Sequence, residues 1–392
     1  MKNRSLFILA LLLLVASLSA QIRFESGSLA CVLEKAQTKH KLVFLDCYTT
    51  WCGPCKWMDK NVFANDTAAQ FYNTHFISSK FDMEKGEGIE IAKRYDVRCF
   101  PTYLFLDEKG VLIHRVSGAY LVAPFVAIGE KTSTPQTCFA AYQTQYETGK
   151  MQAKELIHYM NMKRACCLPV EEETNAFLAT LSETEYLNRE SWTVLRDFVS
   201  DPNTHSFQYL CSHRSAFENR YTADSVALVI ERVYRGAMRN TLFEKKPVDT
   251  LGYLKLRSDV LALKLPNADR FLTGMDISYY ERTKNWNAYA KTATRFVEQH
   301  MPANDIWGLN NMAWAFYKQV SDTVYLAKAL GWAKKSIDMH AAYANTDTYA
   351  ALLYTLGRKE DAEKSAREAI RLAKIEGVSD VSGTEELLKK IR

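Results

Sequence analysis

The chain has 392 residues, of which 47% are apolar and 24% are charged, and these values indicate a globular protein with two or three hydrophobic cores. Its formal charge is only +5, and two of those charges come from Lys2 and Arg4 in the N-terminal leader. So small a charge argues against nucleic acid as the main partner.

Residues 1–20 predict a secretory signal peptide, because a basic start is followed by an apolar stretch over 6–15 and by small residues up to Ala20. An uncleaved membrane anchor is the alternative, but the apolar stretch rises only about 20 Å as a helix, against a hydrocarbon core of roughly 30 Å. We expect cleavage after Ala20 and an exported, periplasmic protein.

The nine cysteines are an odd number, so at least one is unpaired or bonds another molecule. Burial as free thiols is expected for five of them. These are Cys31, Cys138, Cys166, Cys167 and Cys211.

The first third of the chain predicts alternating strands and helices, with parallel crossovers at the start and a hairpin at the end. In chain order we expect an edge strand at 22–24, a helix at 28–38, a strand at 41–47, helices at 56–63 and 66–72, a strand at 75–81, a helix at 88–95, strands at 102–106 and 111–116, and a helix at 123–131.

The motif Trp51-Cys52-Gly53-Pro54-Cys55 lies between the strand at 41–47 and the next helix. Unpaired amides and the helix dipole at a helix N-terminus favour a thiolate, so Cys52 is the predicted nucleophile. Cys55 lies about one turn later, where it can attack a mixed disulfide at Cys52, and is the predicted resolving thiol. Pro54 fits the first helical turn, where its missing amide hydrogen is not needed.

The alternative interpretation of this Cys-x-x-Cys motif is that its two cysteines supply half of the ligands of a structural zinc site. A structural zinc site needs a second ligand pair, but the only later adjacent cysteines are Cys166 and Cys167, and no second pair with the two-residue spacing exists. We therefore predict no metal and no cofactor.

Residues 21–132 resemble a thioredoxin domain in element order and in motif. The matching features are Trp51 to Lys56, Phe100-Pro101-Thr102 before a strand, Asp46 six residues ahead of Cys52, and Ser117-Gly118 after the last strand. The resemblance implies the α/β thioredoxin fold, a central mixed sheet flanked by helices.

The resemblance also implies a cis Pro101 beside the dithiol, and a Phe100 backbone that pairs with an extended substrate strand. An ordinary strand-entry proline is the alternative for Pro101. The other substrate-binding residues that it implies are Trp51, Gly53, Pro54, Thr102 and Gly118.

Asp46 is expected beneath Cys55, where burial would raise its pKa and let it take the proton from the attacking Cys55. Lys80 matches the lysine that accompanies this carboxylate in the family. A strand-end aspartate that only caps a turn is the alternative.

The sequence departs from the family pattern at two places. The helix after Cys55 lacks the mid-helix proline common in cytosolic thioredoxins, so we expect a straighter helix. Cys99 occupies a position where animal thioredoxins also carry a cysteine, and is either a regulatory or dimer-forming third thiol or a small residue that fills a loop.

After a linker at 133–137, the chain predicts helices only, with an irregular helical region at 138–300 punctuated by prolines. Within 301–392, small residues recur at an offset of 33, with Gly357 at a turn between helices. The two sets are Ala329, Ala333 and Ser336, then Ala362, Ala366 and Ala369. A degenerate third copy at Tyr289, Ala293 and Phe296 precedes this range, at an offset of 40. This pattern resembles tetratricopeptide repeats, which bind proteins or peptides.

We therefore expect an exported thiol-disulfide oxidoreductase that reduces protein disulfides, since Gly53-Pro54 is the pair found in reducing thioredoxins. A membrane-bound thiol reductant is the expected electron donor, and a protein or peptide is the expected partner of the repeats. Stabilising the Cys52 thiolate favours an oxidant, so disulfide isomerase or oxidase is the alternative. A binding scaffold with a structural Cys52–Cys55 bridge is the alternative from another class.

Overall fold

A computed structural model describes residues 21–391, and the contacts divide the chain into two compact units, the first ending at Val199 and the second beginning at Ser200. The predicted signal peptide at 1–20 lies outside the described residues. Over 21–391, no helix combines the length and the apolar character needed to cross a membrane.

Unit 1 begins with alternating strands and helices and continues with helices only. Its elements are β1 (Phe24–Glu25), α2 (Leu29–Lys39), β2 (Leu42–Tyr48), α3 (Gly53–Met58), the π-helix η1 (Asp59–Phe63), α4 (Asp66–His75), β3 (Phe76–Asp82), α5 (Glu87–Arg94), β4 (Thr102–Leu106), β5 (Leu112–Ser117), α6 (Val122–Lys131), the 3₁₀ turn η2 (Pro135–Thr137), α7 (Phe139–Glu147), α8 (Ala153–Ala165), α9 (Glu171–Ala179), the 3₁₀ turn η3 (Glu185–Leu187) and α10 (Arg189–Phe198).

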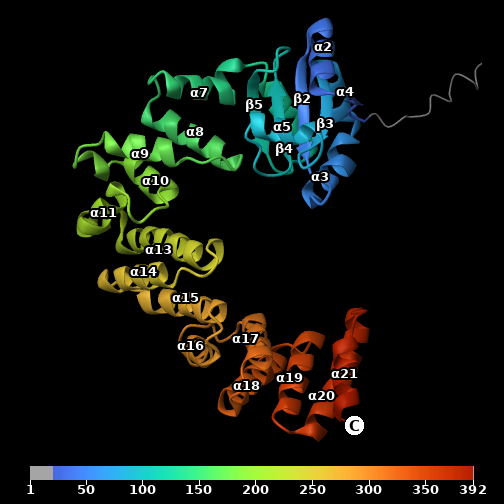
Figure 1. The fold of residues 1–392 in the computed structure, drawn as a ribbon, viewed down its shortest axis with the longest axis vertical. Helices are drawn as coiled ribbons and strands as arrows, with labels where there is room; N and C mark the ends of the chain where they lie inside the picture. Colours follow the sequence, from blue (N-terminus) through green and yellow to red (C-terminus); the bar gives the residue numbers. More distant parts are fainter. Residues whose placement is uncertain (1–20, 392) are drawn as a thin grey trace, which may run out of the picture. The chain divides into compact units, whose positions relative to one another are not determined.

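The five strands form one mixed sheet in the order β1-β3-β2-β4-β5 (Figure 1). β3 pairs in parallel with β1 and β2, whereas β4 pairs antiparallel with β2 and β5. β2 lies in the middle and is buried on both faces, which explains its nearly continuous apolar sequence. The expected fold class, a mixed sheet with flanking helices followed by an all-helical region, is confirmed.

Alternate residues of β2 and β4 face opposite sides of the sheet. Val43, Leu45, Leu104 and Leu106 pack against α2 and α5. Aromatic residues dominate the other side, which packs against α3, η1, α4 and α6; they include Phe44, Phe63, Tyr72, Tyr103, Phe105 and Phe125. Asp46 lies two residues after Phe44, so the alternation directs its carboxylate to the face that α3 covers.

Helices α7 and α8 contact β5, so the beginning of the helical region belongs to unit 1. The Phe139 amide at the start of α7 donates a hydrogen bond to His114 Nδ1 on β5, at 3.1 Å. Burial lowers the pKa of His114 to about 4, so its ring stays neutral and can accept this bond. The arrangement covers a sheet edge that would otherwise expose unpaired backbone groups.

The helix after the dithiol differs from expectation. α3 ends at Met58 and the chain continues as the π-helix η1, so residues 56–63 do not form one regular α-helix, and the straighter course expected for them stays a prediction. The wider turn accompanies the burial of both Val62 and Phe63 in the aromatic core.

Unit 2 is wholly helical over its described residues. Its elements are α11 (His205–Ser212), α12 (Arg214–Tyr221), α13 (Ala223–Arg239), the π-helix η4 (Asn240–Glu244), α14 (Thr250–Ala262), α15 (Ala268–Arg282), α16 (Trp286–Gln299), α17 (Ile306–Gln319), α18 (Thr323–Met339), α19 (Tyr343–Thr355), α20 (Lys359–Glu376) and α21 (Ser382–Ile391).

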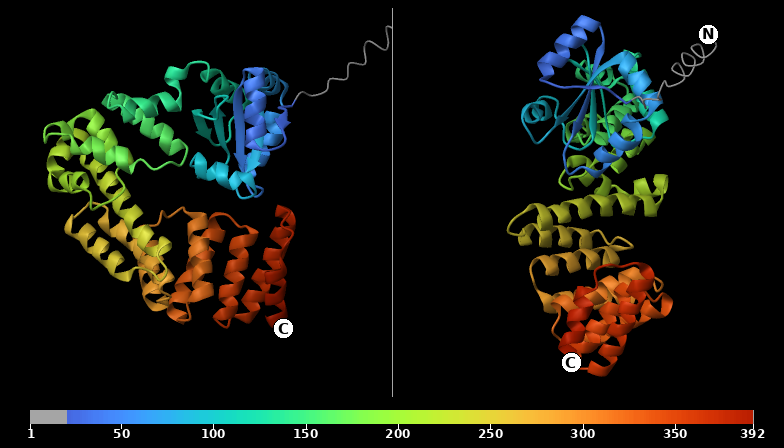
Figure 2. Two further views of the ribbon diagram at one scale, coloured as in Figure 1. Left: turned by 45° about the horizontal axis from the view of Figure 1, so that its top comes forward. Right: turned by 90° about the vertical axis from the view of Figure 1, so that its right-hand side faces the viewer.

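Helices α17 to α20 run side by side as two consecutive hairpins (Figure 2). Gly357 forms the turn between α19 and α20 with a φ of +77°, a conformation that favours glycine. The small residues of both predicted repeats are fully buried in α18 and α20: Ala329, Ala333, Ser336, Ala362, Ala366 and Ala369. They allow close approach of the helices, while the tetratricopeptide assignment and the boundaries 21–132, 133–137, 138–300 and 301–392 stay predictions.

Replacing Ala333 by Leu should lower the stability of the α17–α20 hairpins by about 1–3 kcal/mol, because the added carbons have no space between the helices. Ala327, on the exposed side of α18, provides the matched control, and Ala327→Leu should change stability little. Hydrogen exchange of the α18 amides in the two variants measures the difference, and equal protection would contradict this account of the packing.

Candidate active site

Cys52 is the N-cap of α3, and it forms a disulfide with Cys55 across a Cα–Cα distance of 5.3 Å. The Cys55 amide donates a hydrogen bond to Cys52 Sγ at 3.1 Å, and Pro54 occupies the first turn of the helix. Both cysteines are almost buried, at 3% and 4% exposure. A helix amide thus already points at the sulfur where a thiolate would form on reduction.

Asp46 lies on β2 and is 2% exposed. Desolvation raises its pKa to about 7, an effect only partly offset by Lys80 and reinforced by the negative charge of Asp59. Among the described residues, none forms a hydrogen bond with Asp46 Oδ1. A buried carboxyl group with this pKa can both accept and release a proton near neutral pH.

Lys80 lies between two carboxylates at unequal distances. Its Nζ is 2.6 Å from Asp59 Oδ1 and 4.0 Å from Asp46 Oδ2. Lys80 and Asp59 also line an open pocket of 440 Å³. Asp59 therefore holds the ammonium group away from Asp46, and the pair links the buried carboxyl to a solvent-facing surface.

The loop before β4 contains a cis Phe100–Pro101 peptide bond. The Phe100 ring meets the Trp51 ring edge to face, with centroids 6.0 Å apart. The Gly118 amide donates to the Pro101 carbonyl at 2.9 Å, and Thr102 Oγ1 donates to the Cys99 carbonyl at 2.7 Å. The structure thus brings these predicted residues together at the α3 end of the sheet.

Trp51 is 65% exposed, and its Nε1 donates to Glu84 Oε2 at 2.9 Å. The sequence interpretation missed both Glu84 and Asp59. Asp59 could have been found, because it follows Cys55 by four residues and so shares its helix face. Glu84 carries no comparable local signal, since it lies in the turn after β3.

Comparison with known proteins places this site in a family. The model of a thioredoxin-like domain matches residues 30–133. A thioredoxin of Aspergillus fumigatus is 34% identical over 86 residues, which cover 22% of this chain and 74% of that protein. The chain belongs to the thioredoxin family.

Two further similarities concern the same thioredoxin-like region. Thioredoxin-1 of Drosophila melanogaster is 44% identical over 68 residues, so the match covers 17% of this chain and about three fifths (59%) of the fly protein. The solution structure of a Bacteroides thetaiotaomicron protein, suggested to be a disulphide-isomerase, is 39% identical, and the match covers 29% of this chain and 95% of that one with a TM-score of 0.28.

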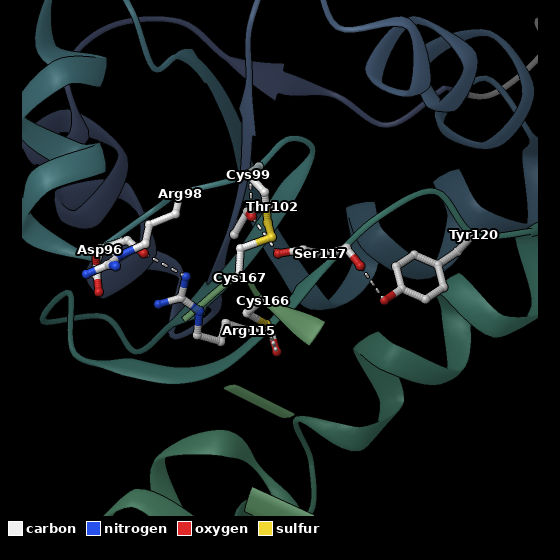
Figure 3. The surroundings of a disulfide bond; sticks show 9 residues. All are labelled: Asp96, Arg98, Cys99, Thr102, Arg115, Ser117, Tyr120, Cys166 and Cys167. Carbon is white, nitrogen blue, oxygen red and sulfur yellow. Dashed lines mark hydrogen bonds and ion pairs between the residues drawn. A yellow bond between two sulfur atoms is a disulfide. The ribbon is translucent and has the colours of Figure 1, made fainter. Parts of the chain in front are cut away.

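A second disulfide, Cys99–Cys167, links the thioredoxin-like region to the turn after α8, between residues 68 positions apart in the sequence (Figure 3). Both interpretations from the sequence, a free regulatory or dimer-forming thiol and a small residue that fills a loop, are therefore wrong for Cys99. The pairing depends on the path of α7 and α8, which returns Cys167 to the loop before Pro101.

The free cysteines agree only partly with the expectation of burial. Cys138 and Cys166 are buried free thiols, whereas Cys31 is exposed and Cys211 is half-buried. Cys167 is exposed and disulfide-bonded, so the expectation for it is also wrong. Over residues 21–391, no group of three or more His, Cys, Asp or Glu side chains is arranged to hold a metal ion.

Replacing Asp46 by Asn should stabilise the oxidised protein most at high pH. The pKa of Asp46 rises from 3.8 to about 7 on folding, so ionisation of this residue destabilises the native state as the pH increases between those values. The expected gain in unfolding free energy is about 4 kcal/mol at pH 8 and about 2 kcal/mol at pH 5. Urea titrations at both pH values measure this gain in unfolding free energy, and hydrogen exchange of the β2 peptide checks that the gain affects β2. A gain that does not change with pH would contradict the assigned pKa.

Protease mapping without reductant should recover Cys99 and Cys167 in one linked peptide pair from the monomeric chain. Cys99→Ser should release Cys167 for alkylation and leave the Cys52–Cys55 bond intact. Disulfide-linked dimers that require Cys99 would instead support the intermolecular role.

Proposed function

We propose that the protein is an exported thiol-disulfide oxidoreductase that reduces disulfides in protein substrates. The observation that carries this proposal is the Cys52–Cys55 pair at the N-terminus of α3, combined with the buried carboxyl of Asp46 on β2. A structural bridge needs neither a titrating carboxyl nor a helix amide directed at one sulfur.

In the first step, the Cys52 thiolate attacks one sulfur of a substrate disulfide. A Cys52–substrate disulfide forms, and the other substrate sulfur leaves as a thiolate. The Cys55 amide, which is within hydrogen-bonding distance of Cys52 Sγ, stabilises the attacking thiolate.

In the second step, Cys55 attacks the sulfur of Cys52, and the substrate is released with both of its sulfurs reduced. The proton of Cys55 passes to Asp46, whose raised pKa suits it to accept a proton near neutral pH. Two electrons move from the protein to the substrate, and the product is the oxidised Cys52–Cys55 pair.

Substrate binding is proposed for the surface around the dithiol. Trp51 and Phe100 provide apolar contacts, and the loop at Phe100 and Pro101 provides backbone groups for an extended segment. The residues with proposed roles in binding are Trp51, Gly53, Pro54, Phe100, Pro101, Thr102 and Gly118.

The proposed setting is the periplasm, which the leader at 1–20 supports, and the proposed electron donor is a membrane-bound thiol reductant. Helices over 301–392 are proposed to be tetratricopeptide-like repeats that hold a protein or peptide partner. The buried small residues of α18 and α20 support the repeat assignment.

The reduction potential of residues 21–392 separates a reductase from the alternatives. In graded thiol-disulfide buffers, alkylation and mass spectrometry report when Cys52 and Cys55 become oxidised. A pair that stays oxidised until the buffer is strongly reducing can donate electrons, as a reductase must. Reduction in mild buffers would support a disulfide isomerase or oxidase.

The scaffold alternative is tested by Cys52→Ala and Cys55→Ala. Cys52→Ala should abolish turnover of insulin disulfides, whereas Cys55→Ala should accumulate a mixed disulfide at Cys52 because no resolving thiol remains. Cys31→Ser, which removes an exposed cysteine outside the motif, is the control and should retain full activity. Undiminished turnover in Cys52→Ala would reject the enzymatic proposal.

Asp46→Asn should slow substrate release by at least tenfold and leave the first attack nearly unchanged, because only the second step uses this carboxyl as a proton acceptor. Stopped-flow fluorescence separates the two rates. Equal slowing of both steps would exclude the proposed proton transfer.

A further inference from the structure

The Cys99–Cys167 disulfide joins two segments that meet beside the dithiol. Cys99 immediately precedes Phe100, whose ring contacts Trp51 next to the reactive Cys52. Cys167 lies in the turn that follows α8, at a Cα–Cα distance of 6.1 Å from Cys99. The turn after α8 is therefore attached one residue away from the proposed binding surface of Trp51, Phe100 and Pro101.

The end of α8 holds Cys167 in an unusual backbone conformation. Its φ is +58°, in the left-handed region where glycine or asparagine usually ends a helix. The Cys167 amide donates to the Arg164 carbonyl at 3.0 Å, and the Leu168 amide donates to the Lys163 carbonyl at 2.9 Å. A bulkier residue replaces glycine at this helix end, and its sulfur bonds Cys99.

Non-covalent contacts hold the two sides of the disulfide to β5 independently of the bond (Figure 3). On one side, Cys166 Sγ donates to the Arg115 carbonyl at 3.8 Å. On the other side, the buried Arg115 guanidinium donates to the carbonyls of Tyr95 and Asp96, at 2.7 and 3.0 Å. Opening the disulfide would therefore leave residues 167–170 held only by local hydrogen bonds to α8 and α9 and by the burial of Val170, while these anchors remain.

We propose that Cys99–Cys167 is a redox-exchangeable latch that fixes residues 167–170 at the border of the binding surface and so restricts which disulfides reach Cys52. This latch rests on the proposed function, the reduction of protein disulfides at Cys52. With the latch closed, the attached turn obstructs bulky folded proteins but leaves room for small disulfides and extended segments. With the latch open, the obstruction is removed.

A dithiol is the reductant class that opens the latch, in two balanced exchanges. Its thiolate attacks Cys167, because Cys167 is exposed and Cys99 is only half-exposed, and Cys99 leaves as a thiolate that takes a proton. The second thiol of the reductant then attacks the mixed disulfide and releases the Cys167 thiolate, which is protonated in turn. The latch gains two electrons and two protons, and the reductant becomes a disulfide.

The first test does not depend on activity and uses the Cys52→Ala/Cys55→Ala chain, titrated with dithiothreitol. Alkylation of Cys99 and Cys167 should appear while the helical circular dichroism stays native. Hydrogen exchange should rise at least fivefold over 167–170 and remain unchanged in β2. A bond that resists reduction until the chain unfolds, or exchange that does not change, would overturn the latch.

The second test compares Cys99→Ser/Cys167→Ser with wild type, using Cys31→Ser as the matched control. The double variant should raise kcat/KM for a folded protein disulfide, ribonuclease A, at least threefold through KM, and should leave kcat/KM for a small aromatic disulfide unchanged. Equal or lower kcat/KM for the folded protein would overturn the proposal. Absence of turnover in wild type would instead reject the proposed function. The latch would then be tested by the hydrogen exchange experiment alone, which does not depend on activity.

Discussion

A single carboxyl group, that of Asp46, is buried in the aromatic half of the sheet, and the proposed chemistry depends on its environment. The alternation of β2 that puts Phe44 into the core also directs Asp46 towards α3, where water is excluded. Its charge is therefore unfavourable, and its pKa rises to about 7. Lys80 offsets only part of this effect, because its ammonium group lies 2.6 Å from Asp59 and 4.0 Å from Asp46. The π-helical turn that begins at Asp59 thus contributes to the electrostatics of the site as well as to its packing.

The cysteines of the chain divide by environment into reactive and unreactive groups. Cys47 lies only one residue from Asp46 but on the opposite, aliphatic face, where burial raises the pKa of its thiol far above the usual range. Burial likewise raises the pKa of Cys138 and Cys166. Cys52, in contrast, meets a helix amide. Burial thus distinguishes Cys47, Cys138 and Cys166 from the exposed Cys31 and from Cys52, which accepts a hydrogen bond from a helix amide.

The helical segment after the sheet is part of the same structural unit as the dithiol. α7 and α8 cover β5, and the turn after α8 is bonded to the loop before Pro101. A neutral His114 and the buried Arg115 anchor this junction from two adjacent positions on β5. The first helices after the strands are therefore joined to the loop that contains the cis Phe100–Pro101 bond.

The sequence by itself determined what depends on neighbouring residues: the apolar run of β2, the helix start at Cys52, and the side of the sheet that Asp46 faces. Short-range periodicity and capping specify these features, because each involves residues within about one or two helical turns. Only the tertiary structure decided that Cys99 forms a disulfide with Cys167, that Lys80 lies closer to Asp59 than to Asp46, and that Trp51 donates a hydrogen bond to Glu84. Each of these contacts joins residues that are far apart in the sequence and that packing brings together. No local sequence pattern indicates which distant residue will be the partner.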